Sequence, residues 1–228
     1  MVDSDMISVR RFSLQGSIWR QRTPMMEQLV RWINSRVAPF GRPINVSHEP
    51  NRSALVSETA FRRAAVGAPL FRHDDGSENA ARDLLLLLPR GLYGEAVLTE
   101  AEQLEVDLVQ QNIMHYASTL TKAIYFHPVP GCGVVSAATA DIVDANGITE
   151  IKAVGRAFRG NDLRQLLTYA AMLYASGAST QRLNLYNPRR AILFSSGLDE
   201  ISLSVCGRSS VELMQDLVDD MIGFQVSA

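Results

Sequence analysis

The chain has few cysteines and no long apolar run. Its 228 residues include only Cys132 and Cys206, too few for a disulfide framework or a four-cysteine metal site, so we expect free thiols. The longest apolar run, residues 84–88, is too short to cross a bilayer, and the N-terminus lacks the apolar segment of a signal peptide. We therefore expect a cytoplasmic protein that does not enter a membrane.

Lysine is also scarce, and charge is unevenly distributed along the chain. Lys122 and Lys152 are the only lysines beside 20 arginines, so a lysine here indicates a position that needs a compact ammonium group. Residues 1–98 carry a net charge of +3 and residues 99–228 a net charge of -5. The overall charge of -2 argues against a diffuse attraction of the whole surface to nucleic acid, but not against a local basic site.

Hydrophobic spacing and capping signals predict a mixed α/β fold. Residues 1–95 are typical of a mainly helical N-terminal extension for dimerisation, partner binding or substrate selection, and residues 96–228 of a sheet-based core. Helices are expected at residues 25–37 after Thr23-Pro24, 51–65, 78–88, 99–120, 162–176 and 209–224, the fourth from a capping box and the last with Ser209 or Ser210 as its N-cap. Strands are expected at residues 123–126, 134–143, 148–154, 181–186, 190–194 and 200–205.

A predicted hairpin brings charged side chains to one face of the sheet. Glu150 and Lys152 are two residues apart on a strand, so they point the same way. If Asn146-Gly147 forms the centre of a tight turn, Asp141 faces Lys152 and lies on the same side as Glu150. Two neighbouring carboxylates repel each other, and a divalent cation such as Mg²⁺ relieves that repulsion. A surface hairpin with an ordinary salt bridge is the alternative interpretation.

The helix that follows adds a second pattern. Gln165 and Tyr169 are four residues apart and share one helical face. That spacing alone also fits the boundary of an ordinary amphipathic helix. A hairpin bearing Asp141, Glu150 and Lys152, followed by this helix, resembles the RecB-like branch of the PD-(D/E)XK nuclease superfamily over about residues 95–194.

The resemblance implies a restriction-endonuclease-like core and a role for each residue of the hairpin motif. Asp141 and Glu150 would be the metal ligands, with the carbonyl of Ile151 completing the coordination, and Lys152 would be the catalytic lysine. The expected cofactor is Mg²⁺ or Mn²⁺.

The resemblance also assigns residues on the two helices. Gln165 and Tyr169 would support the site and contact the nucleic acid. The family often has one more acidic residue or a histidine on the preceding helix, and Glu105 is our choice, with Asp107 and His115 as rivals. Two departures are that alanine replaces the expected glycine before Asp141, and that no cysteine cluster for an iron–sulfur site is present.

Several arginines are candidates for contact with nucleic acid. Arg156 and Arg159 follow the motif strand and are well placed to grip a phosphate backbone, while Arg164 flanks the helical motif. Arg189 and Arg190 lie between two predicted strands, where they form either a phosphate clamp or a solvent-facing turn.

The predicted function is a metal-dependent nuclease that hydrolyses phosphodiester bonds, with DNA favoured and RNA possible. Proteins of the resembled family and of this size are often subunits of prokaryotic restriction or anti-phage defence systems, which implies a homodimer or a larger complex. One alternative is a non-catalytic subunit that uses the same fold to bind nucleic acid or a protein partner. Another is an unrelated α/β protein with a fortuitous hairpin.

Overall fold

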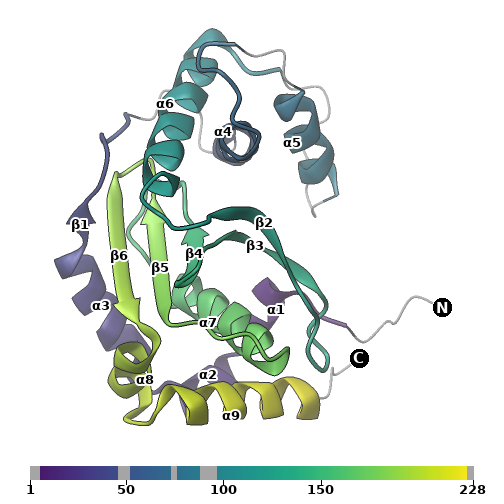
Figure 1. Cartoon of the computed structure of the whole chain (residues 1–228), viewed down its shortest axis with the longest axis vertical. Coiled ribbons are helices and arrows are strands. Elements are labelled where there is room, and N and C mark those ends of the chain that lie inside the picture. The colour runs from purple at the N-terminus through teal and green to yellow at the C-terminus, as the bar shows by residue number, and fades with distance from the viewer. Residues whose placement is uncertain (1–5, 46–51, 73–75, 88–96, 225–228) are drawn as a thin grey trace.

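A mixed six-stranded sheet lies in the middle of the molecule, between groups of helices (Figure 1). The computed structural model describes residues 6–45, 52–72, 76–87 and 97–224. The strands are β1 (Ala38–Pro39), β2 (Ile124–Val129), β3 (Ala138–Val143), β4 (Gly147–Ile151), β5 (Arg182–Asn187) and β6 (Ile192–Gly197), in the spatial order β1-β6-β5-β4-β3-β2. β2, β3 and β4 form an antiparallel meander, whereas β5 runs parallel to β4 and antiparallel to β6.

Helices cover the two faces of the sheet as separate groups. One group consists of α1 (Val9–Ser13), α2 (Gly16–Arg22), α3 (Met26–Arg36), α7 (Gly160–Ala175), α8 (Leu198–Cys206) and α9 (Ser210–Gly223). The other consists of α4 (Ser53–Ala65), α5 (Ser77–Leu86) and α6 (Glu100–Ala117). No helix in the described part of the chain is both long and apolar enough to span a membrane.

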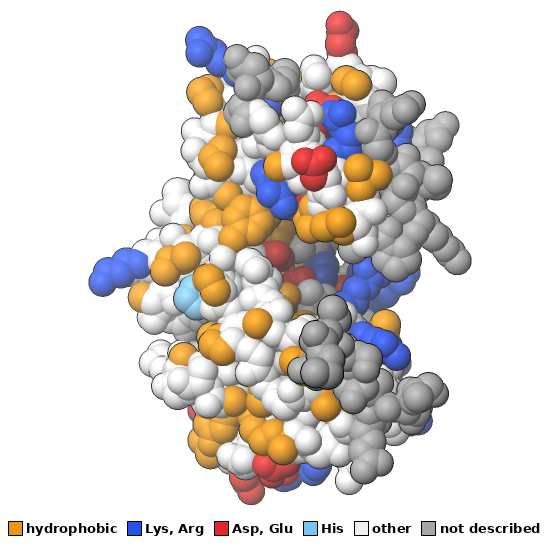
Figure 2. All heavy atoms as spheres, turned by 90° about the vertical axis from the view of Figure 1, so that its right-hand side faces the viewer, with side chains coloured by type: hydrophobic (Ala, Val, Ile, Leu, Met, Phe, Trp, Pro, Cys, Tyr) orange, Lys and Arg blue, Asp and Glu red, His pale blue; other side chains and the backbone are white. Residues whose placement is uncertain are grey.

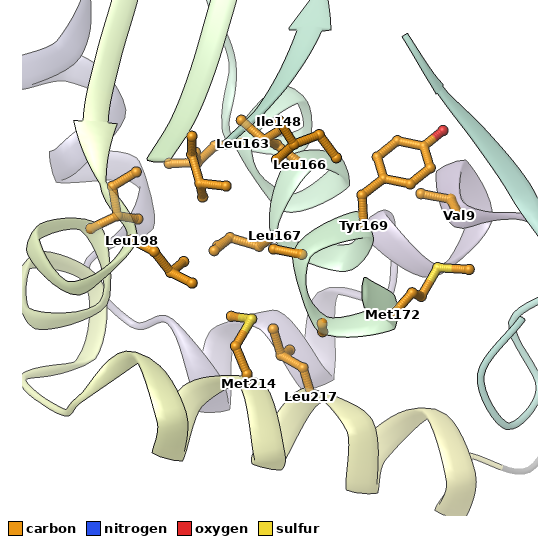
Figure 3. Packing of buried hydrophobic residues seen from close by; sticks show 14 of the residues in the cluster. Val9, Ile148, Leu163, Leu166, Leu167, Tyr169, Met172, Leu198, Met214 and Leu217 are labelled. Atoms are coloured by element: carbon orange, nitrogen blue, oxygen red, sulfur yellow. The ribbon is translucent and has the colours of Figure 1, made fainter. Parts of the chain in front are cut away.

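The helix α7 is the centre of the larger core. Its buried side chains Leu166 and Leu167 lie between Ile148 of β4 and the α9 residues Met214 and Leu217 (Figure 3). On the opposite face, the phenol of Tyr116 on α6 is hydrogen-bonded to the Thr149 hydroxyl at 2.8 Å. Successive residues of β4 therefore point alternately towards α7 and towards α6.

Most predicted elements are confirmed. The helices predicted at residues 25–37, 51–65, 78–88, 99–120, 162–176 and 209–224 correspond to α3, α4, α5, α6, α7 and α9, although residues 51 and 88 lie outside the described part. The capping box is present, because the Glu102 carboxylate accepts the Thr99 N–H at 2.8 Å and the Thr99 hydroxyl accepts the Glu102 N–H at 3.3 Å. Ser209 caps α9 in the same way.

The strand predicted at residues 200–205 is wrong, because this segment belongs to the helix α8. The alternation of Ile201, Leu203 and Val205 with polar residues favoured a strand. The Glu200 carboxylate instead accepts the N–H of Gly197 at 3.1 Å, and Gly207 ends the helix with a positive φ of 70°. These end signals outweigh a short alternating pattern.

The N-terminal segment packs into the larger core. The N–H of Ile7 donates to the carbonyl of Val134 at 2.8 Å, and β1 pairs with β6. The Thr23-Pro24 pair precedes α3 as expected, but the Thr23 hydroxyl donates to the Trp19 carbonyl at 2.8 Å, at the end of α2. The predicted domain boundary near residue 95 lies outside the described residues.

The hairpin between β3 and β4 forms with a register that differs from the predicted one by two residues. Val143 pairs with Ile148, and Ile142 pairs with Thr149, whereas the tight turn predicted Val143 opposite Glu150. The Asp144 N–H donates to the Gly147 carbonyl at 2.9 Å, so the turn is centred on residues 145 and 146. A shift of two leaves every side chain on its predicted face, because side chains on a strand alternate with period two.

Gly147 permits the close approach of β4 and β5. A methyl group there would lie 2.3 Å from the main-chain oxygen of Arg182, its partner in the parallel pair. The Asn-Gly pair was interpreted as a turn signal, but this glycine is required for strand packing.

We expect Gly147→Ala to lower the free energy of unfolding by about 1–3 kcal/mol, because the main chain of β5 cannot move away without loss of the sheet pairing. Urea unfolding measures the change. Gly223→Ala is the control, since no atom lies within 4 Å of a methyl group added there. Equal stability of the two variants would contradict this role for Gly147.

Candidate active site

Three residues of the predicted motif lie close enough on the α7 side of the sheet for the charges of Glu150 and Lys152 to act on Asp141. The Lys152 ammonium donates to Glu150 Oε1 at 2.6 Å, and the Ile151 N–H donates to Asp141 Oδ2 at 2.7 Å. Glu150 is buried, while Asp141 and Lys152 are half-buried. The charged ends are therefore held in place at the edge of the core.

The helix α7, which packs on this face of the sheet, contacts the group. Lys152 Nζ also donates to Gln165 Oε1 at 3.0 Å, so Gln165 and Glu150 together orient the ammonium. One turn later, the Tyr169 hydroxyl donates to the carbonyl of Thr139 on β3 at 3.1 Å. The two motif residues of the helix thus contact Thr139 of β3 and Lys152, the residue that follows β4.

Burial and like charge shift the carboxylates towards their protonated forms. Desolvation, followed by the negative charge of Glu150, raises the pKa of Asp141 well above its usual value, although the Ile151 amide and Lys152 act in the opposite direction. Desolvation also raises the pKa of Glu150, against the effect of Lys152. Burial alone would lower the pKa of Lys152, but Glu150 outweighs it and raises that pKa. The single ammonium group of Lys152 therefore does not balance the two carboxylates.

The structure corrects the expected positions of Glu105 and Arg189. Glu105 lies on the buried face of α6, but α6 covers the sheet face opposite Lys152. Its carboxylate forms an ion pair with the Arg189 guanidinium at 2.6 Å, and both side chains are almost fully buried. Arg189 also donates to the Ser57 hydroxyl at 3.3 Å. This cation therefore links α6 and α4 to the β5–β6 turn inside the protein, and neither the phosphate clamp nor the solvent-facing turn describes Arg189.

The remaining predicted arginines occupy different environments. Arg156 makes two hydrogen bonds to the buried Asp162 carboxylate, at 2.6 and 2.9 Å. Arg164 is bonded to Glu27 at 3.1 Å, while Arg159 and Arg190 are exposed. Of these four arginines, Arg156 and Arg159 line the same pocket as Lys152.

That pocket includes residues that the sequence did not bring together. It has a volume of about 410 Å³ and is lined by Lys152, Gln165, the loop after β4, the first turn of α7, and the residues Arg10, Ser13 and Leu14 from α1 and its end. The surface in Figure 2 is hollowed between its upper and lower parts, with acidic side chains in the hollow and basic ones beside it. Arg10 had no sequence signal for this position, because only the tertiary packing of α1 on α7 places it there.

Glu58 of α4 is a further acidic residue whose charge acts on the site. Its negative charge contributes to the raised pKa of Asp141, and Arg62 is bonded to it at 2.8 Å. Among the described residues, no three or more histidine, cysteine or acidic side chains gather into a metal-binding cluster. A divalent cation at this site would therefore depend on two carboxylates, main-chain oxygen and solvent.

No protein-family model, curated protein or solved structure matches this chain.

The raised carboxylate pKa predicts the effect of Asp141→Asn in the absence of divalent cations. The asparagine can still accept the Ile151 N–H, but it removes the charge that repels Glu150. We expect the variant to melt a few degrees above the wild type at neutral pH. Thermal unfolding in a chelator, followed by circular dichroism, measures the difference.

This difference should depend on pH with a defined sign. Asp141 in the folded protein keeps its proton to a higher pH than it does in the unfolded chain, where aspartates titrate at about pH 3.9. The wild type therefore loses stability relative to the variant as pH rises from that value through the folded pKa, and the gap narrows in acid. Asp144→Asn in the turn is the control, since it leaves the pair with Glu150 intact. A gap that widens towards low pH would refute the assignment.

Proposed function

We propose that this protein is a metal-dependent nuclease of the PD-(D/E)XK type. The observation that carries the proposal is the proximity of Asp141, Glu150 and Lys152, with Lys152 bonded to Glu150 and to Gln165 of the following helix. Its position beside a basic pocket supports a phosphate-containing substrate.

The donor chemistry of the site fits Mg²⁺ or Mn²⁺. Mg²⁺ is commonly held by one or two carboxylates, with water and substrate phosphate as the other ligands. Asp141 and Glu150 supply such carboxylates, and the Ile151 carbonyl is the proposed main-chain ligand. Their raised pKa values support this fit, since a divalent cation would relieve both the repulsion and the cost of burying charge. When bound, such an ion lowers the pKa of a water and neutralises charge on the phosphate.

The protein residues have separate proposed roles around the scissile bond. Lys152 keeps its proton, since Glu150 raises its pKa, so it acts by donating a hydrogen bond to the attacking water or to the phosphate oxygen. Gln165 limits the ammonium to one orientation, and the Ile151 N–H fixes one oxygen of Asp141. Charge stabilisation and orientation, rather than proton abstraction, are the proposed contributions of Lys152.

We expect Lys152→Ala to reduce cleavage by at least about 100-fold, as the loss of a charged donor at a reaction centre commonly does. Wild type and variant are incubated with plasmid, linear duplex, single-stranded DNA and RNA, with Mn²⁺ and with a chelator. Lys122→Ala removes the other lysine, which is exposed, and serves as the control. Metal-dependent cleavage that survives Lys152→Ala would reject the proposed role.

We expect Mn²⁺ to raise the melting temperature of the wild type but not that of Asp141→Asn. An ion that binds only the folded state adds about 2.7 kcal/mol at 100 times its Kd. Differential scanning fluorimetry across a Mn²⁺ titration measures this effect. If neither cleavage nor metal stabilisation is detected, the catalytic proposal fails and a non-catalytic binding subunit becomes the better interpretation.

A further inference from the structure

The pocket beside Lys152 contains more positive charge than its neighbours balance. Four cationic side chains and one carboxylate line it: Arg10, Lys152, Arg156, Arg159 and Asp162. Arg156 is already paired with Asp162, and Lys152 with Glu150. Arg10 and Arg159 are exposed and have no ion-pair partner among the described residues. The two free guanidinium groups therefore face the same space.

The helix α1, which carries Arg10, is held in place by core contacts. The main chain at Arg10 therefore has a fixed position beside the pocket. The neighbouring residues Val9 and Phe12 are buried against the core that contains α7. The Trp19 indole N–H donates to the Phe12 carbonyl at 3.0 Å. Just before α1, the Ser136 N–H donates to the Ile7 carbonyl at 3.0 Å. These contacts hold α1 beside α7, on the side of the molecule where Figure 1 places it.

The size and position of the pocket indicate what it accepts. A volume of about 410 Å³ lies near the lower end of the range for small-ligand sites and suits about one nucleotide. Lys152 lines the pocket and also bonds Glu150, so a nucleotide held there adjoins the carboxylates. Neutral donors are present as well, in the side chains of Asn161 and Gln165.

We infer that this pocket binds the terminal phosphate of a nucleic-acid strand, with Arg10 and Arg159 as its principal ligands. A terminal phosphate carries about -1.5 to -2 charges near pH 7, whereas an internal phosphodiester carries one. Two unpaired guanidinium groups match the larger charge, and their planar forks can each bind two phosphate oxygens. The inference rests on the proposed nuclease function and extends it, since a nuclease with such a pocket acts next to a phosphorylated strand end.

Binding can be tested without catalysis. Labelled single-stranded oligonucleotides with a 5′-phosphate, a 3′-phosphate or hydroxyl ends are titrated with wild-type protein in a chelator, and fluorescence anisotropy gives the Kd of each. We expect one phosphorylated end to bind at least about tenfold more tightly than the hydroxyl end, as charge-assisted hydrogen bonds imply. Thymidine 5′-monophosphate and inorganic phosphate, added as competitors, distinguish a strand end from a free nucleotide or free anion as the ligand.

The variants assign the effect to the pocket. We expect the double variant Arg10→Gln, Arg159→Gln to lose the preference for the phosphorylated end. Arg11→Gln, an exposed arginine next to Arg10 that does not line the pocket, should keep it. Melting temperatures of the variants report whether they fold. Equal affinity for all strand ends, or a preference that persists in the folded double variant, would overturn the inference.

The two proposals can fail independently. Metal-dependent cleavage by the wild type without any preference for a phosphorylated end would leave the nuclease and remove the terminal-phosphate pocket. A preference that depends on Arg10 and Arg159, without cleavage of any substrate and without stabilisation by Mn²⁺, would support the pocket and reject the catalytic proposal.

Discussion

The arrangement of the site depends on the hydrogen bonds that the Lys152 ammonium donates to Glu150 and Gln165. This ammonium places a positive charge beside a buried carboxylate on a central strand of the sheet and connects that strand to α7. Removing one partner of a buried charged group leaves the other uncompensated, which is costly. The same ammonium does not balance Asp141 fully, so burial and the charge of Glu150 still raise the pKa of Asp141. The positive charge of Lys152 therefore does not balance the negative charges of Asp141 and Glu150.

A second buried ion pair performs a structural task on the other face of the sheet. Glu105 and Arg189 join α6 to the turn between β5 and β6, and Arg189 also reaches Ser57 of α4. Because this pair is almost fully enclosed, each charge balances the other, and Arg189 also donates to the main-chain carbonyl of Ser53 at 3.3 Å. Residues with the same chemistry therefore have different roles in this protein. Glu150 is bonded to Lys152, which lines a pocket that reaches solvent, whereas Glu105 faces an arginine inside the fold.

The candidate site was predictable where the evidence was local. Glu150 and Lys152 are two residues apart on one strand, and Gln165 and Tyr169 four apart on one helix, so strand and helix periodicity alone put each pair on one face. The error of two residues in the predicted register left the predicted faces unchanged, because a shift of two keeps Asp141 on the side of Glu150. The helix α8 was mistaken for a strand, since a pattern as short as residues 200–205 fits both periods until its end caps are considered.

The sequence by itself determined the order of elements from residue 99 to β6, the faces of the motif residues and the caps of α6 and α9, because these depend on contacts between residues a few positions apart. Only the tertiary structure decided that Arg189 is buried against Glu105 and that Arg10 from α1 joins Arg159 at the pocket beside Lys152. Such partners lie far apart along the chain. Their meeting depends on how whole helices pack on the sheet, and no local spacing encodes that packing.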